Sequence, residues 1–457
     1  MKRATASAPA AARALSFAPL AALGFVGWLA AAPAQAAAPI QTLTSPGGID
    51  FWLVEEQTIP MVAVEIDFRG GARTDADDKA GAASFMAAMM TEGAGERDSV
   101  AFSEAAQLLG VRLGVSADRD SVSVSARMLA DNLQDSVALI REALTAPRFD
   151  DEPMARVRAQ TLSSIRSGEA DPNTLASQAW FAAAFPGDPY GRPTIGTAET
   201  VAALTAQDLR DAHGRLLTRA NAIVGVVGAI DAQAAGEMLD ALMGDLPEGP
   251  APESLPPVAV AAEPGVTVIP FDAPQSTVMF GHEGPLRDDP DFIPIFVMNH
   301  ILGGGGFTSR LTTEVRERRG LAYSVYAYPA PFDRAGVYLG GVGTANARVA
   351  ESIEVITAEW RRLATEGVTD EELAKAQQFL TGAYALRFDS NAAIARNLVA
   401  LQRDGFGPEY VEERNDLVNA VTTEDIARVA AKWLRPDALH FVVVGQPEGV
   451  ETGPLGQ

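Results

Sequence analysis

The sequence predicts an α+β protein that contains two similar domains, each a mixture of strands and helices. The first observation is an internal repeat: TAQDLRDAHGRLLTRANAIVGVVGAID, which begins at Thr205, returns without a gap as TTEDIARVAAKWLRPDALHFVVVGQPE from Thr422. The second is that strand-like segments occur in hairpins as well as between helices, which favours a mixed or antiparallel sheet over a doubly wound parallel one.

The repeat also divides the chain. Each copy reads as a helix, a turn and an apolar strand that ends in glycine, at Gly228 and at Gly445. Between the copies, residues 246–265 contain six prolines, which cannot form a helix or a central strand and so predict an extended linker. We therefore expect one domain at residues 40–245 and a second at residues 266–450.

The first domain opens with a strand pair at residues 51–71 and continues with a helix at 81–90. Alternation of apolar and polar residues with period two over 112–129 predicts a half-buried strand hairpin. Helical patterns follow at residues 129–146 and 151–168, the latter opened by acidic residues.

The second domain begins with another strand pair at residues 266–284. A helix that ends at Arg319 is closed by Gly320, because glycine readily takes the left-handed conformation that follows a helix, and a strand comes next. Further helices are expected at residues 348–364 and 370–385.

The composition limits the possible functions. The 457 residues carry a net charge of -23 and contain no cysteine. This charge argues against nucleic-acid binding and favours cationic partners, although acidity that only aids solubility remains the alternative. Without cysteine the chain forms no disulfide and carries no lipid-modified N-terminal cysteine.

The N-terminus has the pattern of an export signal. Residues 1–36 contain a basic start, a long apolar stretch and the sequence Ala34-Gln35-Ala36, whose small residues on either side of Gln35 resemble a cleavage site. We expect cleavage near Ala36, a periplasmic location and no stable membrane span afterwards. An uncleaved anchor and full secretion are the alternatives.

The helix at residues 81–90, GAASFMAAMM, carries no side chain suited to catalysis. The four histidines, at positions 213, 282, 300 and 440, show no metal-ligand spacing, and the methionines of this helix are better explained as core residues.

Several segments in order resemble the M16 peptidases, the family of pitrilysin, insulinase and the mitochondrial processing peptidase. They are GGART, KAGAASFMAAMMTEG, PYGRPTIGTAETV and LGGGGFTSRLTTEVRERRGLAYSVYA. Active M16 members carry His-x-x-Glu-His, in which two histidines bind zinc and the glutamate activates a water molecule. The resemblance places Ser84, Ala87 and Ala88 at these positions and Ser164 at the third zinc ligand. It therefore implies half of an M16 chamber with no metal in this chain.

The resemblance also implies two catalytic residues in the second domain. Arg316 and Tyr323 match an Arg and Tyr pair that completes the active site of M16 peptidases. Arg316 would hold a substrate carbonyl and Tyr323 would stabilise the developing oxyanion.

Two segments are predicted to contact an extended peptide. One is the strand edge formed by Gly114, Val115, Ser116 and Ala117, where main-chain hydrogen bonds would hold the substrate. The other is the glycine run that includes Gly304 and Gly305, which reads as a hinge or rim and lacks the Gly-Lys-Ser/Thr of a phosphate loop.

The leading hypothesis is a zinc-free subunit of a heterodimeric periplasmic M16 peptidase, inactive alone, whose partner carries His-x-x-Glu-His and zinc. The pair would cleave short extended peptides, with cationic ones favoured by the acidity of the chain. The alternative is a catalytically inert M16-fold subunit for peptide binding or assembly. An autonomous hydrolase has little support, because the chain has neither a Gly-x-Ser-x-Gly motif nor a cysteine nucleophile.

Overall fold

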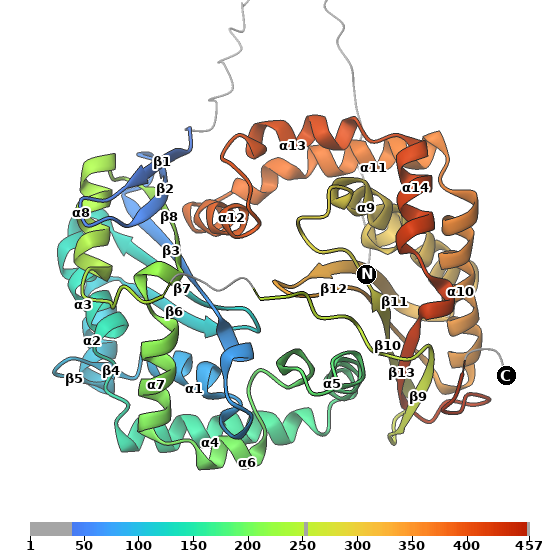
Figure 1. Cartoon of the computed structure of the whole chain (residues 1–457), viewed down its shortest axis with the longest axis horizontal. Coiled ribbons are helices and arrows are strands. Elements are labelled where there is room, and N and C mark those ends of the chain that lie inside the picture. Colours follow the sequence, from blue (N-terminus) through green and yellow to red (C-terminus); the bar gives the residue numbers. More distant parts are fainter. Residues whose placement is uncertain (1–38, 251–254, 455–457) are drawn as a thin grey trace, which may run out of the picture. The chain divides into compact units, whose positions relative to one another are not determined.

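The computed structural model describes residues 39–250 and 255–454. The predicted signal peptide therefore lies outside the described residues, as do residues 251–254 of the proline-rich segment. The described chain contains two mixed sheets with helices packed on them, which confirms the predicted α+β class (Figure 1). Over these ranges, no helix has the length and apolar character needed to cross a membrane.

The first sheet has the strand order β1-β2-β8-β3-β7-β6. Its strands are β1 (Gln41–Thr44), β2 (Asp50–Glu55), β3 (Met61–Arg69), β6 (Arg112–Ala117), β7 (Ser121–Leu129) and β8 (Ala222–Gly228). Strands β2 and β8 are parallel, and all other neighbours are antiparallel. The predicted hairpin at residues 112–129 is confirmed. The predicted pairing of β2 with β3 is wrong, because β8 lies between them.

The helices of the first half agree with the sequence periodicity. They are α1 (Ala82–Met89), α2 (Ser99–Leu109), α3 (Leu133–Thr145), α4 (Asp151–Gly168), α5 (Pro172–Ala184), α6 (Ala198–Ala203), α7 (Ala206–Leu216) and α8 (Ala232–Met243). A short hairpin, β4 (Gly93–Ala94) and β5 (Arg97–Asp98), separates α1 from α2. Local capping fixes several boundaries: the Asp98 side chain accepts the Ala101 amide at the start of α2, and Gly110 ends it at φ 72°.

The second sheet has the order β11-β12-β10-β13-β9. Its strands are β9 (Gly265–Pro270), β10 (Gln275–Glu283), β11 (Ala322–Pro331), β12 (Gly336–Ala345) and β13 (His440–Gly445). Its helices are α9 (Phe292–Asn299), α10 (Val349–Glu366), α11 (Asp370–Gly382), α12 (Asn391–Arg403), α13 (Tyr410–Asn419) and α14 (Thr423–Trp433). Here too the opening strands β9 and β10 are not neighbours, because β13 lies between them.

The two halves have the same topology, as the internal repeat predicts. Five strands of the first sheet, β2-β8-β3-β7-β6, correspond in order and direction to β9-β13-β10-β12-β11 of the second. The helices before β8 and β13 begin with the same capping box, Thr205 with Asp208 in α7 and Thr422 with Asp425 in α14.

The glycines that end β8 and β13 explain one feature of the repeat. Gly228 has φ 146° and Gly445 has φ 158°, and a Cβ atom would lie 2.1 Å from the Met61 carbonyl oxygen at Gly228 and 2.2 Å from Ser276 Oγ at Gly445. Both the backbone conformation and the close neighbour therefore require glycine at the end of this strand.

The halves exchange one helix each. Helix α12 of the second half packs on β8 and β3 of the first sheet, and α5 of the first half packs on β10 and β13 of the second sheet (Figure 1). Trp180 of α5 is fully buried, and its Nε1 donates to the His440 carbonyl oxygen at 3.3 Å. Gly281 leaves room for this ring, since a Cβ there would lie 2.9 Å from Trp180 Cζ2. Each sheet is thus covered partly by the other half.

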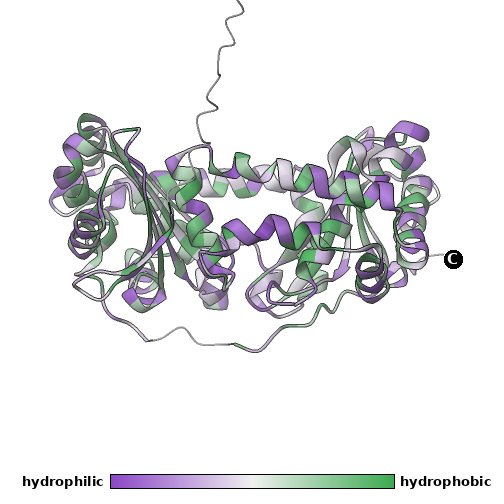
Figure 2. Ribbon diagram, turned by 90° about the horizontal axis from the view of Figure 1, so that it is seen from above, coloured by the Kyte–Doolittle hydropathy of each residue, from purple (hydrophilic) through white to green (hydrophobic). Residues whose placement is uncertain are grey.

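The core follows this arrangement. One apolar cluster lies in the first half and a second in the second half, while a third joins α5 to strands β12 and β13. In Figure 2 apolar residues gather where helices meet the sheets, and polar residues lie on the outer sides of the helices. The third cluster includes Trp180, Phe181 and Tyr190 from the first half, together with Leu339 and Val442 from the second.

Candidate functional site

Helix α1 contains three of the positions that the sequence resemblance aligns with the M16 zinc motif, and its side chains do not fit a metal. Ser84 Oγ donates to the Thr194 carbonyl oxygen at 2.8 Å, and Ala87 is buried. Ala88 and Ser164 are exposed and offer no imidazole or carboxylate. Across residues 39–250 and 255–454, no group of three His, Cys, Asp or Glu residues is placed to hold a metal ion.

The buried side of α1 explains why the helix is present. Phe85, Met86 and Met89 point into the first core, with exposed fractions of 2% or less. Gly81 precedes the first residue of the helix; its φ is 95°, and a Cβ there would lie 2.6 Å from the Ile195 carbonyl oxygen. The element serves packing between the first sheet and the segment that follows α5.

His282 is a core residue. It is 2% exposed, its Nδ1 lies 2.6 Å from the Glu283 carbonyl oxygen, and its Nε2 accepts a hydrogen bond from Trp360 Nε1 at 3.0 Å. Burial lowers the pKa of His282 to about 4, so the ring is neutral at ordinary pH. With both ring nitrogens engaged, His282 has no free atom for a metal.

The structure brings Arg316 and Tyr323 together. Arg316 lies on the helical turn Thr312–Arg318, and Gly320 at φ 60° turns the chain into β11, which carries Tyr323. The Arg316 guanidinium lies 4.8 Å from the Tyr323 ring centre and 4.7 Å from that of Phe307. Phe307 was not predicted from the sequence. The only sequence feature that could have indicated it is its position directly after the glycine run.

The two aromatic rings of this group are exposed, and its arginine lacks an ion-pair partner in the described part of the chain. Tyr323 is 82% and Phe307 67% exposed. Glu317 follows Arg316 directly and forms no ion pair with it, and Glu314 pairs with Arg318 at 2.6 Å and Arg319 at 2.5 Å, so Arg316 has no ion pair among the described residues. An arginine between exposed aromatic rings is typical of a surface that binds a partner or a ligand.

The glycine run packs closely against neighbouring backbone. A Cβ on Gly303 would lie 2.7 Å from the Ala327 nitrogen of β11, one on Gly304 2.7 Å from Asn299 Nδ2, and one on Gly305 2.6 Å from the His300 carbonyl oxygen. These contacts account for the glycines by close packing and position the loop that presents Phe307. The predicted role of Gly304 and Gly305 in substrate binding stays a prediction.

Strand β6 lies at the edge of the first sheet and pairs only with β7 among the described strands. The predicted peptide-binding residues 114–117 therefore lie on a strand with one free edge. Its side chains alternate between exposed and half-buried, and nothing lies within 4 Å of a Cβ on Gly114. Strand β11, which carries Tyr323, occupies the corresponding edge of the second sheet.

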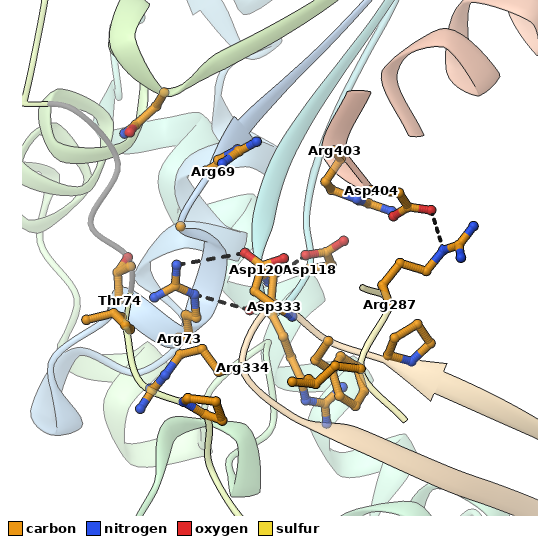
Figure 3. Close-up of a pocket in the computed structure, with 18 of the residues that line it drawn as sticks. Arg69, Arg73, Thr74, Asp118, Asp120, Arg287, Asp333, Arg334, Arg403 and Asp404 are labelled. Atoms are coloured by element: carbon orange, nitrogen blue, oxygen red, sulfur yellow. Dashed lines mark hydrogen bonds and ion pairs between the residues drawn. The ribbon is translucent and has the colours of Figure 1, made fainter. Parts of the chain in front are cut away.

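A cavity of about 1060 Å³ is lined by residues of both halves. Figure 3 shows Arg73 beside Asp120 and Asp333, and Arg287 directed at Asp404. The lining contains seven arginines and five aspartates: Arg69, Arg73, Arg119, Arg215, Arg287, Arg334, Arg403, Asp118, Asp120, Asp288, Asp333 and Asp404. The acidity of the whole chain therefore does not extend to this cavity.

Comparisons with known proteins agree with this geometry. Residues 51–198 match the family described as "Insulinase (Peptidase family M16)", and residues 203–380 match the "Peptidase M16 inactive domain". The chain belongs to the M16 peptidase family. A solved M16 inactive domain from Pseudomonas fluorescens is 27% identical, with a TM-score of 0.85 over 91% of this chain and 100% of that one.

Curated M16 relatives span nearly the same length. An uncharacterized zinc protease of Streptomyces coelicolor is 27% identical over 406 residues, 86% of each chain. The non-peptidase homolog YmxG of Helicobacter pylori is 25% identical over 335 residues, 73% of this chain and 77% of that one. This M16 chain therefore resembles relatives of both kinds, and its own α1 has the side chains of a non-catalytic member.

Buried polar contacts join the two halves of this M16 fold at one edge of the large cavity. Tyr190 donates its hydroxyl hydrogen to Asp120 Oδ1 at 2.7 Å and accepts the Arg334 amide at 3.1 Å. Arg73 Nε lies 3.1 Å from Asp120 Oδ1, and the Asp333 amide donates to Asp120 Oδ2 at 3.2 Å. Burial and the nearby Asp120 raise the pKa of Asp333 to about 6.

Replacing Tyr190 by phenylalanine tests this contact. The substitution keeps the buried ring and removes a donor to Asp120 and an acceptor for the Arg334 amide. We expect a loss of about 1–3 kcal/mol in the free energy of unfolding, because buried polar groups are left without partners. Urea unfolding of both proteins measures it, with the exposed Tyr326→Phe as the control. Equal stability of the Tyr190 variant and the parent would contradict the assigned hydrogen bonds.

The face of β3 that meets α12 carries two buried acids. Glu65 is 6% exposed and accepts from Ser125 Oγ at 2.6 Å and 2.8 Å, and Asp67 lies 3.2 Å from Arg403 of α12. Burial raises the pKa of Glu65 to about 7. Because the Glu65 carboxyl has a higher pKa in the folded state than in the unfolded state, the folded protein binds more protons. The free energy of unfolding is therefore highest at low pH in respect of this group, and it falls as the pH rises from about 4.5 to about 7.

Glu65→Gln removes this titration and keeps the shape of the side chain. We expect the variant to be more stable than the parent by roughly 1–3 kcal/mol at about pH 8, and to differ little at about pH 5, where the parent carboxyl is largely protonated. Urea unfolding at both pH values measures the difference. Glu104→Gln, on the exposed side of α2, is the control. If the stability difference between Glu65→Gln and the parent is the same at both pH values, the raised pKa is refuted.

Proposed function

We propose that this chain is the zinc-free member of a two-subunit M16 peptidase and that it acts in the periplasm. The observation that carries the proposal is the pairing of Arg316 with the exposed Tyr323 on a chain whose α1 has no zinc ligands. A purely structural role does not explain an arginine without an ion pair among the described residues beside an 82% exposed tyrosine. The arrangement suits a site completed by another polypeptide.

The proposed chemistry assigns distinct tasks to this chain. The planar guanidinium of Arg316 would hold a peptide carbonyl oxygen in place, since it offers several donors in a rigid arrangement. The Tyr323 hydroxyl would donate a hydrogen bond to the oxygen that becomes negative as the peptide bond is attacked. A partner with His-x-x-Glu-His would supply zinc, which activates the attacking water.

The free edge of β6 supports an extended substrate. Residues 114–117 have unpaired main-chain groups on their outer side among the described strands, so a peptide could add there as a further strand. The net charge of the chain favours cationic peptides, but the arginine-rich lining of the large cavity does not add to that preference.

Reconstitution tests the proposal. The mature chain would be purified alone and together with an M16 protein that has His-x-x-Glu-His, preferably one encoded beside it. We expect no peptide cleavage by the chain alone, and chelator-sensitive cleavage by the pair well above that of the partner alone. Stoichiometric zinc in the isolated chain, or chelator-sensitive cleavage by it, would contradict the proposal. Cell fractionation with an antibody against the chain tests the periplasmic location.

The second candidate is an inert M16-fold subunit that binds peptides or supports assembly. It is favoured by the resemblance to a protein named a non-peptidase homolog and to a solved inactive domain. Two results together would support this candidate over the first. The chain would associate with a partner without changing the partner's rate of cleavage, and it would bind peptides at β6.

A further inference from the structure

A second cavity, of about 310 Å³, lies within the second half and belongs to no site described above. Its walls come from α9, β11, the turn Tyr384–Phe388, α12 and α13. It shares Arg287 and Asp404 with the large cavity, so the two adjoin. Arg316 and Tyr323 do not line it. Its volume is at the lower end of the range for small-molecule sites in proteins.

A buried arginine lies in the wall of this cavity. Arg414 is 7% exposed, and its Nη1 donates to the Leu380 carbonyl oxygen at 2.8 Å and to Asn415 Oδ1 at 3.0 Å. Its Nε and Nη2 atoms make no hydrogen bond to any described residue, and no described carboxylate pairs with it. Burial lowers the pKa of Arg414, which reflects the cost of an enclosed charge without a counter-ion.

The rest of the lining adds positive charge. Arg287 Nε donates to Asp404 at 2.7 Å, so these two charges offset each other. Arg387 also lines the cavity and has no carboxylate partner in the described part of the chain. The cavity therefore has an excess of two positive charges, in a protein with a net charge of -23. Such a site attracts an anion.

The walls indicate the shape of that anion. Aromatic rings dominate them: Phe292, Phe296, Tyr328, Tyr384 and Tyr410. Arg414 already stacks on two of these rings, at 4.6 Å from the centre of Tyr384 and 5.5 Å from that of Phe296. The tyrosine hydroxyls of this lining donate no hydrogen bond to any described residue, and they remain available for a ligand oxygen.

We propose that this cavity binds a small aromatic carboxylate, with the ring between the aromatic walls and the carboxylate on the free Nε and Nη2 edge of Arg414. Arginine suits this task because its parallel donors match the two oxygens of a carboxylate. The same chemistry is offered by a free aromatic acid and by the C-terminal aromatic residue of a peptide.

Calorimetric titration of the purified chain tests the proposal. We expect saturable binding of benzoate. The neutral benzamide should bind with an affinity at least roughly tenfold lower, because it cannot form the charge-assisted hydrogen bond. N-acetylphenylalanine distinguishes the two sources: tighter binding than benzoate identifies a peptide C-terminus, and weaker binding identifies a free acid. Binding of neither carboxylate, or equal binding of benzoate and benzamide, would overturn the proposal.

Two variants locate the site. Arg414→Gln should weaken benzoate binding roughly tenfold or more, whereas Arg127→Gln, on the exposed side of β7, should leave it unchanged. Ala400→Phe keeps every charge and fills the cavity, so it should abolish binding in a protein that melts like the parent. If Arg414→Gln does not fold, Ala400→Phe still tests the location of the site. Undiminished benzoate binding by Ala400→Phe would refute that location.

Discussion

Trp180→Ala is expected to lower the free energy of unfolding by about 3–5 kcal/mol, the largest stability effect that we predict. The side chain is fully buried, its ring fills the space above Gly281, and its Nε1 bonds the His440 carbonyl oxygen. The substitution leaves a cavity between α5 and the second sheet that the backbone cannot close, because α5 is also held by Phe181 and Phe185 in the same cluster. Urea unfolding followed by circular dichroism gives the value.

Trp180→Phe is the matched variant for this experiment. It keeps an aromatic ring against β10 and β13 and loses mainly volume and one hydrogen bond, so its cost should be clearly smaller. An alanine variant within about 1 kcal/mol of the parent would show that α5 is not a permanent cover of the second sheet.

Arg316→Ala is expected to lower the turnover number of the reconstituted pair by roughly 10²–10³-fold, the cost typical of losing one preorganised donor at a developing charge. The association of the two subunits should change little, because the lost interaction is with substrate. Turnover and subunit affinity are measured separately, the first with a fluorogenic peptide and the second by titration of labelled subunits.

Arg318→Ala is the control for Arg316. Arg318 lies on the same turn, its side chain is 65% exposed, and its partner Glu314 keeps a second ion pair with Arg319. Tyr323→Phe removes only a hydroxyl group and should also lower turnover. Full activity of the pair with either Arg316→Ala or Tyr323→Phe would refute the role in trans, and equal losses for Arg316 and Arg318 would point to a structural effect.

Features with local causes were predicted from the sequence. The repeat that begins at Thr205 and Thr422 predicted two domains of the same fold, and identical capping boxes and strands confirm the shared topology. The turn at Gly320 was correct because a left-handed residue after a helix favours glycine. Arg316 and Tyr323 meet as expected because a short, tightly specified turn connects them.

Features that depend on long-range contacts were not predicted. Nothing in the strand at residues 222–228 indicates that it inserts between β2 and β3, because a buried apolar strand fits beside any other. The sequences of α5 and α12 likewise do not indicate that each helix packs on the sheet of the other half, because an apolar helix face can pack on either sheet. The arginine excess of the large cavity is hidden as well, since its charged residues come from six distant segments of an acidic chain.

The exchange of helices has a consequence for the order of events during synthesis. Strand β8 is complete at residue 228, but α12, which covers it, begins only at residue 391. While the ribosome makes the intervening residues, the face of β8 and β3 that α12 covers, with its acids Glu65 and Asp67, lacks this cover. The final burial of this face must therefore wait until nearly the whole polypeptide has emerged.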